Sequence, residues 1–241
     1  MIRDFREKQK QRQKTLKIRA KSLATKLAIL FQAKTSGARR MHHAYHAELS
    51  LFSPTGARKY LNNVERKRFQ NVIANLCTHR RLFCAALFWS GGRVSEILAL
   101  VPAAIDLDTG TIAILTLKRR KHGIVRQVPL PRAIIRDLSR AFCLREAQLD
   151  PEKATRRMWP WSRTTAWRLV KKVMSDAGVT GVSASPKGLR HTFGVNAFQR
   201  NVPPHLVQRW LGHASLRTTT IYGDVSGREE RQLASRMWRK S

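Results

Sequence analysis

The chain carries arginines, a histidine and a tyrosine in an order that suits chemistry on a phosphate group. "SGGRVSEILAL" places Arg93 after a Gly-Gly bend, with Glu96 one turn on, where a carboxylate can hold the guanidinium. "KGLRHTF" supplies Arg190, "WLGHAS" supplies His213, and "TTTIY" ends in Tyr222, nine residues after His213. Metal-free cleavage of a phosphodiester needs a nucleophile, cations around the non-bridging oxygens and an acid for the leaving oxygen. "LKRRKHG" adds lysines in an expected hairpin, so each part has a candidate.

Metal-dependent and nucleotide-dependent chemistry is not favoured by the sequence. Two-metal sites on phosphate need clustered carboxylates, but the 15 Asp and Glu are scattered, and Asp106 with Asp108 belongs to an expected turn. The phosphate-binding pattern G-x-x-x-x-G-K-[ST] does not occur. His42, His43 and His46 stand in a basic stretch without acidic or Cys partners, so we interpret them as part of a solvated segment. We therefore expect no metal, no cofactor and no nucleotide.

The charge of the chain points to a polyanionic partner. Lys and Arg number 47 against 15 Asp and Glu, which gives a formal charge of +32 and favours nucleic acid over an anionic membrane. The early apolar run at 27–31 is too short to span a membrane. Cys77, Cys84 and Cys143 are odd in number and stand in apolar helical runs, so we expect buried thiols in a reducing compartment. These features predict a soluble, cytoplasmic protein that binds nucleic acid and no membrane.

The elements that must position the reactive residues are mainly helical. "YLNNVERKRFQNVIANL" begins a helix with a capping-box pattern at Asn62 and Glu65. Its buried face is expected to consist of Val64, Phe69, Val72, Ile73 and Leu76. Further helices are expected through "LFCAALFWS" and "RVSEILAL", from Pro131 as the first helical residue, over 163–177, and after Pro186 and Pro203–Pro204. Helical spacing also predicts that Trp89, Trp167 and Trp210 belong to the core.

A small sheet interrupts these helices. "TIAILTL" and "IVRQVPL" alternate apolar and polar residues around a basic stretch, and Asp108-Thr109-Gly110 is a turn signal. The predicted fold class is therefore mainly α with a small three-stranded antiparallel sheet.

Two parts are expected along the chain. Residues 1–47 hold 13 Lys and Arg against two acidic residues, and an apolar stripe there predicts a helix. "SPTG" then forms a linker. We expect a basic helical N-terminal segment over 1–52, a reduced or minimal DNA-binding arm, and a domain over 53–241 that ends in a tail helix from about residue 226.

The ordered motifs resemble those of the tyrosine recombinase (phage integrase) family, whose catalytic domain has an active site like that of type IB topoisomerases. "GLRHTF", then "LGHAS", then "TTTIY" is a specific series, and the resemblance covers residues 58–225. It implies the tyrosine recombinase catalytic domain fold. It also implies site-specific DNA cleavage and religation through a 3′-phosphotyrosyl intermediate, without metal or ATP, in integration, excision or resolution of a mobile element. Two alternatives stay open: a DNA-binding relic or regulator of the same fold without turnover, and a monomeric topoisomerase-like relaxase.

The resemblance assigns roles to residues of this chain. Tyr222 corresponds to the nucleophile, Arg93 and Arg190 to the arginines that clamp the phosphate, His213 to a third phosphate contact, and Glu96 to the support of the first arginine. Arginine suits this task because its fork binds two oxygens in fixed geometry. Tyr45 and Tyr60 compete only formally as nucleophiles, and Tyr60 is expected to be a packing residue.

Two lysines correspond less directly to the family's pattern. The family's general acid is a hairpin lysine, best matched by Lys121, with Lys118 as the second choice. The family usually has histidine three residues before the second arginine, and this chain has Lys187 there. A lysine can donate to a phosphate oxygen but is a poor base for the Tyr222 proton at neutral pH. His191 directly follows Arg190, and we expect it to be structural, with a backbone carbonyl as partner.

The family further implies a homotetramer that acts on two DNA sites through a four-way junction. Its members generally carry a helical DNA-binding domain of four or more helices on the N-terminal side. Residues 1–52 have room for one or two helices. We therefore expect a minimal recombinase whose basic helix grips DNA alone or with a partner.

Overall fold

The computed structural model describes residues 50–116 and 123–223, together with 231, 234, 235 and 237. The chain divides into two compact units, Met1–Leu49 and Ser50–Ser241, and all described residues belong to the second. Several expected features lie outside the described residues: the basic N-terminal helix, Lys118, Lys121 and most of the tail from about residue 226.

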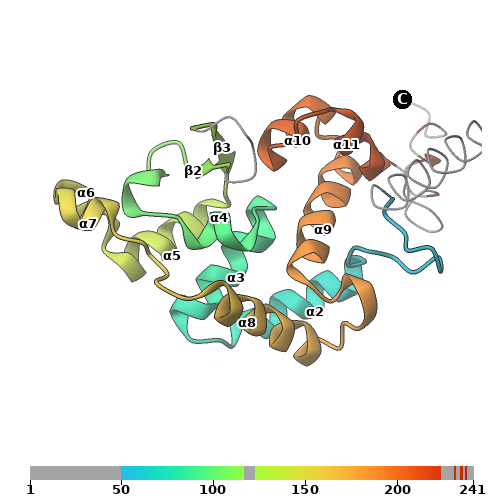
Figure 1. Ribbon diagram of the computed structural model, residues 1–241, viewed down its shortest axis with the longest axis horizontal. Helices are drawn as coiled ribbons and strands as arrows, with labels where there is room; N and C mark the ends of the chain where they lie inside the picture. The colour runs from blue at the N-terminus through green and yellow to red at the C-terminus, as the bar shows by residue number, and fades with distance from the viewer. Residues whose placement is uncertain (1–49, 117–122, 224–230, 232–233, 236, 238–241) are drawn as a thin grey trace, which may run out of the picture. The chain divides into compact units, whose positions relative to one another are not determined.

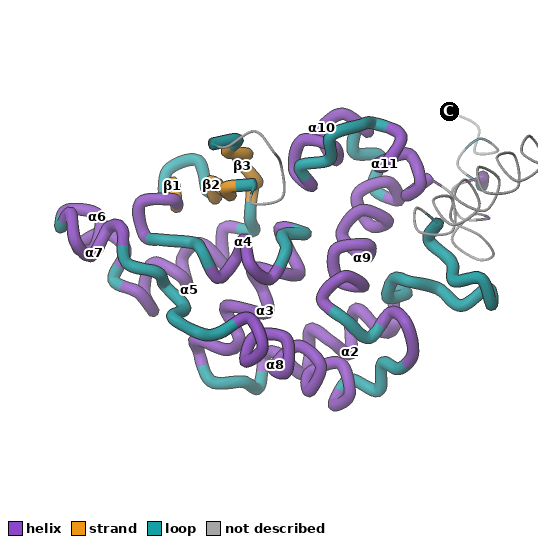
Figure 2. Tube along the Cα trace, viewed as in Figure 1, coloured by secondary structure: helices purple, strands orange, loops and turns teal. Residues whose placement is uncertain are grey.

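Helices make up most of the described unit, with the small sheet beside α4 and α10 (Figures 1 and 2). The α-helices are α2 (Asn63–Ala74), α3 (Thr78–Ser90), α4 (Val94–Leu98), α5 (Arg132–Phe142), α6 (Leu144–Leu149), α7 (Pro151–Thr155), α8 (Arg163–Asp176), α9 (Pro186–Gln199), α10 (Pro204–Leu211) and α11 (Arg217–Thr220). Short 3-10 turns are η1 (Pro102–Ala104), η2 (Gly181–Ser183) and η3 (Ile221–Gly223). No helix in the described part of the chain combines the length and the apolar character needed to cross a membrane.

The predicted three-stranded antiparallel sheet is confirmed. Strands β1 (Ile105–Asp106), β2 (Thr111–Leu115) and β3 (Val125–Pro129) pair in the order β1-β2-β3. Ile112 lies opposite Val128, and Ile114 lies opposite Arg126. All four of these side chains are buried, as the period of two in a strand requires for one face turned to the core. Arg126 is the one charged member of this buried row.

The core is centred on α3, whose side chains from Leu82 to Phe88 are all buried. The helix packs against α2, α5 and α9, so it fixes the position of α9 relative to the rest of the unit. Trp159 packs edge-on against Phe83 and Phe142, and its indole N–H donates to the His79 carbonyl over 3.0 Å. A residue in the connection before α8 thereby anchors the start of α3.

Local signals set several helix starts correctly. Asn62 accepts from the Glu65 amide over 2.8 Å, and the Glu65 carboxylate accepts from the Asn62 amide over 2.7 Å, so the capping box is confirmed. Pro186 is the first residue of α9, and the Ser185 hydroxyl caps the helix by accepting from the Gly188 amide over 3.1 Å. Pro131 differs from the prediction, because it stands one residue before α5 and the helix begins at Arg132.

Some predicted core positions are exposed. Val64 in the first turn of α2 is 64% exposed and Trp167 in α8 is 47% exposed, because helical periodicity does not mark where packing partners end. Cys84 is buried as predicted, but Cys77 and Cys143 are exposed. Cys77 precedes α3, and Cys143 joins α5 to α6 with a φ of 46°, so both occupy helix boundaries at the surface. The prediction of three buried thiols was wrong for these two. Tyr60, with 1% exposure, is a packing residue as predicted.

Candidate active site

Helix α9 carries Arg190 into the interior, where the side chain joins three separate segments. Its Nη1 donates to the Gly91 carbonyl over 2.8 Å, and its Nη2 donates to the Leu211 carbonyl over 2.5 Å. Gly91 ends α3 in the left-handed region and Leu211 ends α10, so the guanidinium is oriented by the ends of two other helices. Burial, reinforced by the charge of Arg93, lowers the pKa of Arg190 to about 10, which leaves it a cation at neutral pH.

Arg93 is the N-cap residue directly before α4 and is paired with Glu96 as the sequence predicts. The Arg93 Nη1 donates to Oε1 of Glu96 over 2.7 Å, and the Arg93 amide donates to Oε2 over 2.9 Å. One third of the Arg93 side chain is exposed, whereas the Glu96 side chain is almost fully buried. Glu96 thus holds the base of α4 and turns the guanidinium of Arg93 at the same time.

Sequence reasoning missed a third arginine, Arg126 in β3. Its Nη2 donates to Oε2 of Glu96 over 2.6 Å, its Nη1 to the Thr116 hydroxyl over 3.0 Å, and its Nε to the Trp210 carbonyl over 2.8 Å. These bonds tie the sheet to α4 and to the end of α10. The signal was available, because alternation in "IVRQVPL" puts Arg126 and Val128 on the same inward face. An arginine buried there requires a buried carboxylate.

Glu96 is therefore a carboxylate between two guanidinium groups. Burial would raise the pKa of Glu96, but the hydrogen bond and charge of Arg126 and the amide and charge of Arg93 outweigh burial and hold the pKa below its usual value. The group is ionised at neutral pH. It is the counter-charge that allows Arg126 to be buried beside Arg190.

Tyr222 lies in η3 against α9, and only 1% of it is exposed. The ring rests on Gly194, where an added Cβ would come within 2.6 Å of ring carbons, so this position of the tyrosine depends on a residue without a side chain. Burial raises the pKa of Tyr222 to about 12, although the nearby charges of Arg190 and Arg93 act in the opposite direction. The hydroxyl is thus neutral and close to both guanidinium groups.

His213 lies beside the same tyrosine. The two rings are stacked, with centroids 6.0 Å apart and planes 17° apart, and the His213 Nδ1 is 2.9 Å from the Thr219 hydroxyl. Burial, followed by the charges of Arg190 and Arg93, lowers the pKa of His213 to about 3. The imidazole is therefore neutral, and its orientation is fixed through Nδ1.

His191 lacks the backbone carbonyl partner that the sequence predicts. Its Nδ1 is 3.4 Å from the Tyr222 hydroxyl, and its Nε2 is buried without a hydrogen-bond partner among the described residues. Burial, together with the charges of Lys187, Arg190 and Lys59, lowers the pKa of His191 to about 4. The reason the prediction failed is geometric: η3 brings the tyrosine hydroxyl to this side of α9, which no local pattern reveals.

The structure thus brings together Arg93, Glu96, Arg190, His213 and Tyr222, since the charges of Arg93 and Arg190 act on both the tyrosine and the histidine. Lys187, in the first turn of α9, is exposed, and its charge reaches His191. Lys121 and Lys118 lie outside the described residues. Within the described part of the chain, no group of three His, Cys, Asp or Glu is arranged to hold a metal ion.

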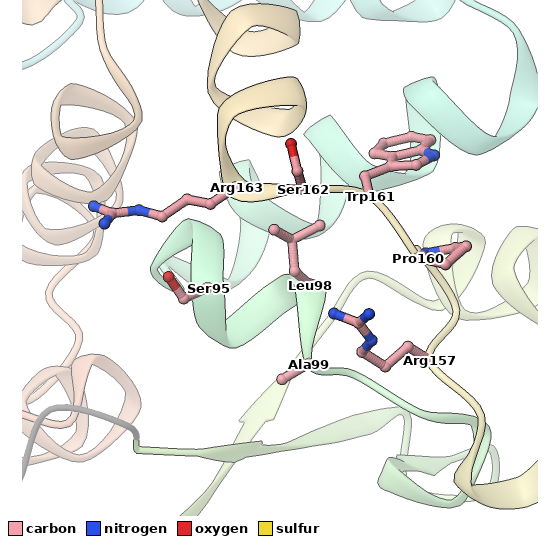
Figure 3. A pocket seen from close by; sticks show the side chains of 8 residues that line it. All are labelled: Ser95, Leu98, Ala99, Arg157, Pro160, Trp161, Ser162 and Arg163. Carbon is pink, nitrogen blue, oxygen red and sulfur yellow. The ribbon is translucent and has the colours of Figure 1, made fainter.

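The described unit has two hollows, one of which is lined in part by residues of the site. One, of about 640 Å³, lies between the sheet and α10 and is lined by Arg126, His213 and Gln208 among others, so it opens beside the clustered arginines. The second, of about 470 Å³, lies between α4 and the start of α8 (Figure 3). Figure 3 shows Arg157 extending toward Leu98 and Ala99 in this second hollow. Both hollows carry arginines and suit anionic groups.

Comparison with known proteins gives consistent matches to this region. The model of the phage integrase family matches residues 59–229. Tyrosine recombinase XerA of Thermococcus kodakarensis is 32% identical over 179 residues, which cover 72% of this chain and 60% of that protein. The chain spans about three fifths of the length of such relatives.

Solved structures have the same fold. The crystal structure of XerA recombinase matches with a TM-score of 0.63 at 23% identity, covering 76% of this chain and 66% of that one. The structure of XerH site-specific recombinase bound to its difH substrate, a pre-cleavage complex, matches with a TM-score of 0.59 at 24% identity, covering 75% of this chain and 55% of that one. At this level of identity the two structures establish the fold.

Proposed function

The chain belongs to the phage integrase family, and from this premise we propose that it is a site-specific DNA recombinase that cleaves and rejoins double-stranded DNA through Tyr222. The observation that carries the proposal is the gathering of Arg93, Arg190 and His213 around Tyr222: both arginine charges act on the tyrosine and the His213 ring stacks on it. These groups match what phosphodiester cleavage without a metal requires. The XerH complex with its difH substrate supports DNA as the partner.

In this mechanism the Tyr222 oxygen attacks the scissile phosphorus, and the bond to the 5′ oxygen breaks. Arg93 and Arg190 bind the non-bridging oxygens, whose charge grows in the transition state. Both guanidinium groups are held by other protein groups, so they are oriented before DNA arrives and little ordering remains to be done. The phosphotyrosyl bond retains the energy of the cleaved linkage, which is why rejoining needs no ATP.

Two lysines complete the proposed site. Lys121, with Lys118 as the alternative, would protonate the leaving 5′ oxygen from the hairpin between β2 and β3. Lys187 would donate to a phosphate oxygen together with Arg190, because residues three apart lie on one face of a helix. Its exposed position at the start of α9 is compatible with contact to a DNA backbone.

The nucleophile is covered in this structure. With 1% of Tyr222 exposed, its hydroxyl has to become accessible before a phosphate can meet it. Cleavage therefore requires that DNA binding shift η3 or the side chains around it. This provides a simple safeguard, because a buried neutral tyrosine does not react with DNA encountered at random.

Membership of the family also supports a proposal for the arrangement of the whole chain and for its oligomeric state. Residues 1–52 would form a reduced basic DNA-binding arm and residues 53–241 the catalytic domain, and four copies would act on two DNA sites in the cytoplasm. A monomeric relaxase and a relic without turnover are less favoured, because the similar proteins are named recombinases and the arginine clamp is intact.

A covalent-capture experiment tests the proposal. The protein is incubated with a library of short randomised duplexes, denatured in detergent, and the DNA that remains attached is sequenced. We expect protein-linked DNA with one enriched sequence, attached through a 3′ phosphate, and none with the Tyr222→Phe variant, whose DNA binding should be retained because binding rests on phosphate contacts. Adducts with Tyr222→Phe would instead implicate another nucleophile. The absence of adducts with the wild-type protein, despite specific binding, would favour the relic.

A second step separates recombination from relaxation. Two duplexes of different length that carry the enriched sequence are mixed with the protein, and the products are separated by size. Exchanged products are expected from a recombinase. Relaxation of a supercoiled plasmid without exchanged products would support the relaxase.

A further inference from the structure

We propose that His191 is the catalytic base that takes the proton from Tyr222 during cleavage, a role that rests on the proposed function. His191 is the group in hydrogen-bond contact with the Tyr222 hydroxyl among the described residues, with Nδ1 3.4 Å from the phenolic oxygen. Such contacts are commonly longer without substrate than in the reacting complex.

The position of His191 on α9 complements that of Lys187. It follows Lys187 by four residues, so the two side chains lie on one face of the helix, one turn apart. Lys187 is exposed at the start of the helix, and His191 is 8% exposed beneath it. An ammonium group can donate to a phosphate but cannot accept a proton. The imidazole one turn deeper can accept one.

The other histidine of the site is engaged elsewhere. The Nδ1 of His213 pairs with the Thr219 hydroxyl, and the ring stacks on the face of Tyr222 and makes no hydrogen bond with its hydroxyl. His191 has the opposite arrangement, with Nδ1 at the hydroxyl and Nε2 buried without a partner among the described residues. For Nδ1 to accept from Tyr222, the neutral ring must carry its proton on Nε2. The buried Nε2–H of that tautomer then has no acceptor among the described residues, which costs folding free energy. A catalytic role for the ring explains why the protein keeps a histidine there.

The charges around His191 set its protonation. Lys187 and Arg190 face it from α9, Lys59 from the segment before α2, and Tyr222 from η3. His213, after α10, is also close enough to interact electrostatically with His191. Burial and the three cations lower the pKa of His191 to about 4, so the ring is unprotonated at neutral pH and ready to accept. A phosphodiester between Arg93 and Arg190 brings a negative charge that offsets these cations. Its arrival raises the basicity of His191 when the proton has to be taken.

Proton transfer to His191 accompanies the attack of Tyr222 on phosphorus. The O–H electron pair of Tyr222 forms the new bond to phosphorus while the proton passes to Nδ1 of His191, which becomes an imidazolium. The bond between phosphorus and the 5′ oxygen breaks, and that oxygen takes a proton from the hairpin lysine to give a 5′ hydroxyl. Rejoining reverses each transfer, with the imidazolium returning its proton to the phenolic oxygen.

The test compares wild type with His191→Asn in single-turnover adduct formation on the duplex selected above, nicked beside the cleavage position so that the adduct accumulates. Asparagine places an oxygen near the position of Nδ1 and can keep the bond to Tyr222, but it does not titrate. We expect adduct formation to slow by ~10²–10⁴-fold, the usual contribution of a general base. We also expect the wild-type rate to fall with acid between pH of about 4 and about 6.5, and the variant to lose this limb.

The outcomes separate this proposal from the proposed function. If wild type forms no adduct, the proposed function fails. If wild type forms adducts and His191→Asn is equally fast or faster, His191 only holds Tyr222 in its covered position and the base role is refuted. A second measurement needs no variant: nitrogen NMR of the wild-type imidazole should show the proton on Nε2 at neutral pH. A proton on Nδ1 would overturn the proposal, because that ring donates to the tyrosine.

Discussion

Replacing Glu96 by Gln, a side chain of nearly equal size, should destabilise the fold far more than the same exchange does at an exposed position. Oε1 of Glu96 accepts from the Arg93 guanidinium, and Oε2 accepts from the Arg126 guanidinium and the Arg93 amide. An amide NH₂ in either orientation therefore faces a donor. The variant loses a hydrogen bond as well as the charge.

The size of this destabilisation depends on how deeply each arginine partner of Glu96 is buried. The side chain of Arg126 is 3% exposed, so without Glu96 it is a buried charge with no counter-charge, which typically costs ~3–5 kcal/mol. The Arg93 side chain is 33% exposed and solvent screens its pair, so its loss adds less than about 1 kcal/mol. We expect a loss of ~3–5 kcal/mol in the free energy of unfolding, measured by urea denaturation at fixed ionic strength.

The matched control is Glu146→Gln, the same exchange at an exposed position in α6, which should cost less than about 0.5 kcal/mol. The difference should also depend on pH. Because the folded pKa of Glu96 lies below its ordinary value of 4.5, its stabilising contribution is complete above that value and is lost as the pH falls through the folded pKa. A loss within about 1 kcal/mol of the control at neutral pH would refute the reasoning, since Arg126 would not depend on Glu96.

Other changes probe the arginine clamp, the packing of Tyr222 and the N-terminal segment. Arg190→Lys should slow adduct formation by ~10²–10³-fold with DNA affinity nearly unchanged, because lysine keeps the charge and loses the fork; near-normal cleavage would exclude the clamp role. Gly194→Ala should cost ~1–3 kcal/mol in urea denaturation because its methyl group meets the Tyr222 ring, whereas Gly223→Ala, with contacts at 3.7 Å, should be mild; equal losses would contradict this packing. Deleting residues 1–47 removes 13 cations, and if half of them contact phosphate, the slope of log affinity against log salt should fall by ~6; an unchanged slope would show that the segment does not grip DNA.

The sequence predicted the helices and the sheet because the signals involved are local. Asn62 and Glu65 satisfy each other within one turn, and the alternation in β2 and β3 is confirmed residue by residue. Exposure was predicted less well. Trp167 follows helical periodicity and is still half-exposed, because burial depends on whether another element covers that face, which is a property of the whole fold.

In the candidate site, too, contacts between residues close in the sequence were predicted and contacts between distant residues were not. The Arg93–Glu96 pair spans three residues and was predicted correctly, while the contacts of Arg126 reach 30 residues back to Glu96 and 84 residues forward to Trp210. The contact between His191 and Tyr222 spans 31 residues and depends on how η3 returns to α9. Resemblance to a family supplied positions for residues that match a motif. It assigned no role to His191. The base role proposed for His191 depends on residue 187 being a lysine, which is a poor proton acceptor.

In the described site, three arginines lie near a single carboxylate, an arrangement that disfavours folding but suits the binding of an anion. Arg93, Arg126 and Arg190 share one carboxylate, Glu96, and Arg126 lies closest to it, with Nη2 2.6 Å from Oε2. Among the described residues, Arg190 has only carbonyl oxygens as hydrogen-bond partners. After burial, its pKa is lowered chiefly by the charge of Arg93. Burial, and then the charges of Arg190 and Arg93, lower the pKa of His213 to about 3. Burial is the largest cause of each lowered pKa, and the rest reflects a positive potential from the neighbouring arginines. An anion placed between Arg93 and Arg190 would offset that second part. A phosphodiester is such an anion, and Tyr222 is the nucleophile beside it.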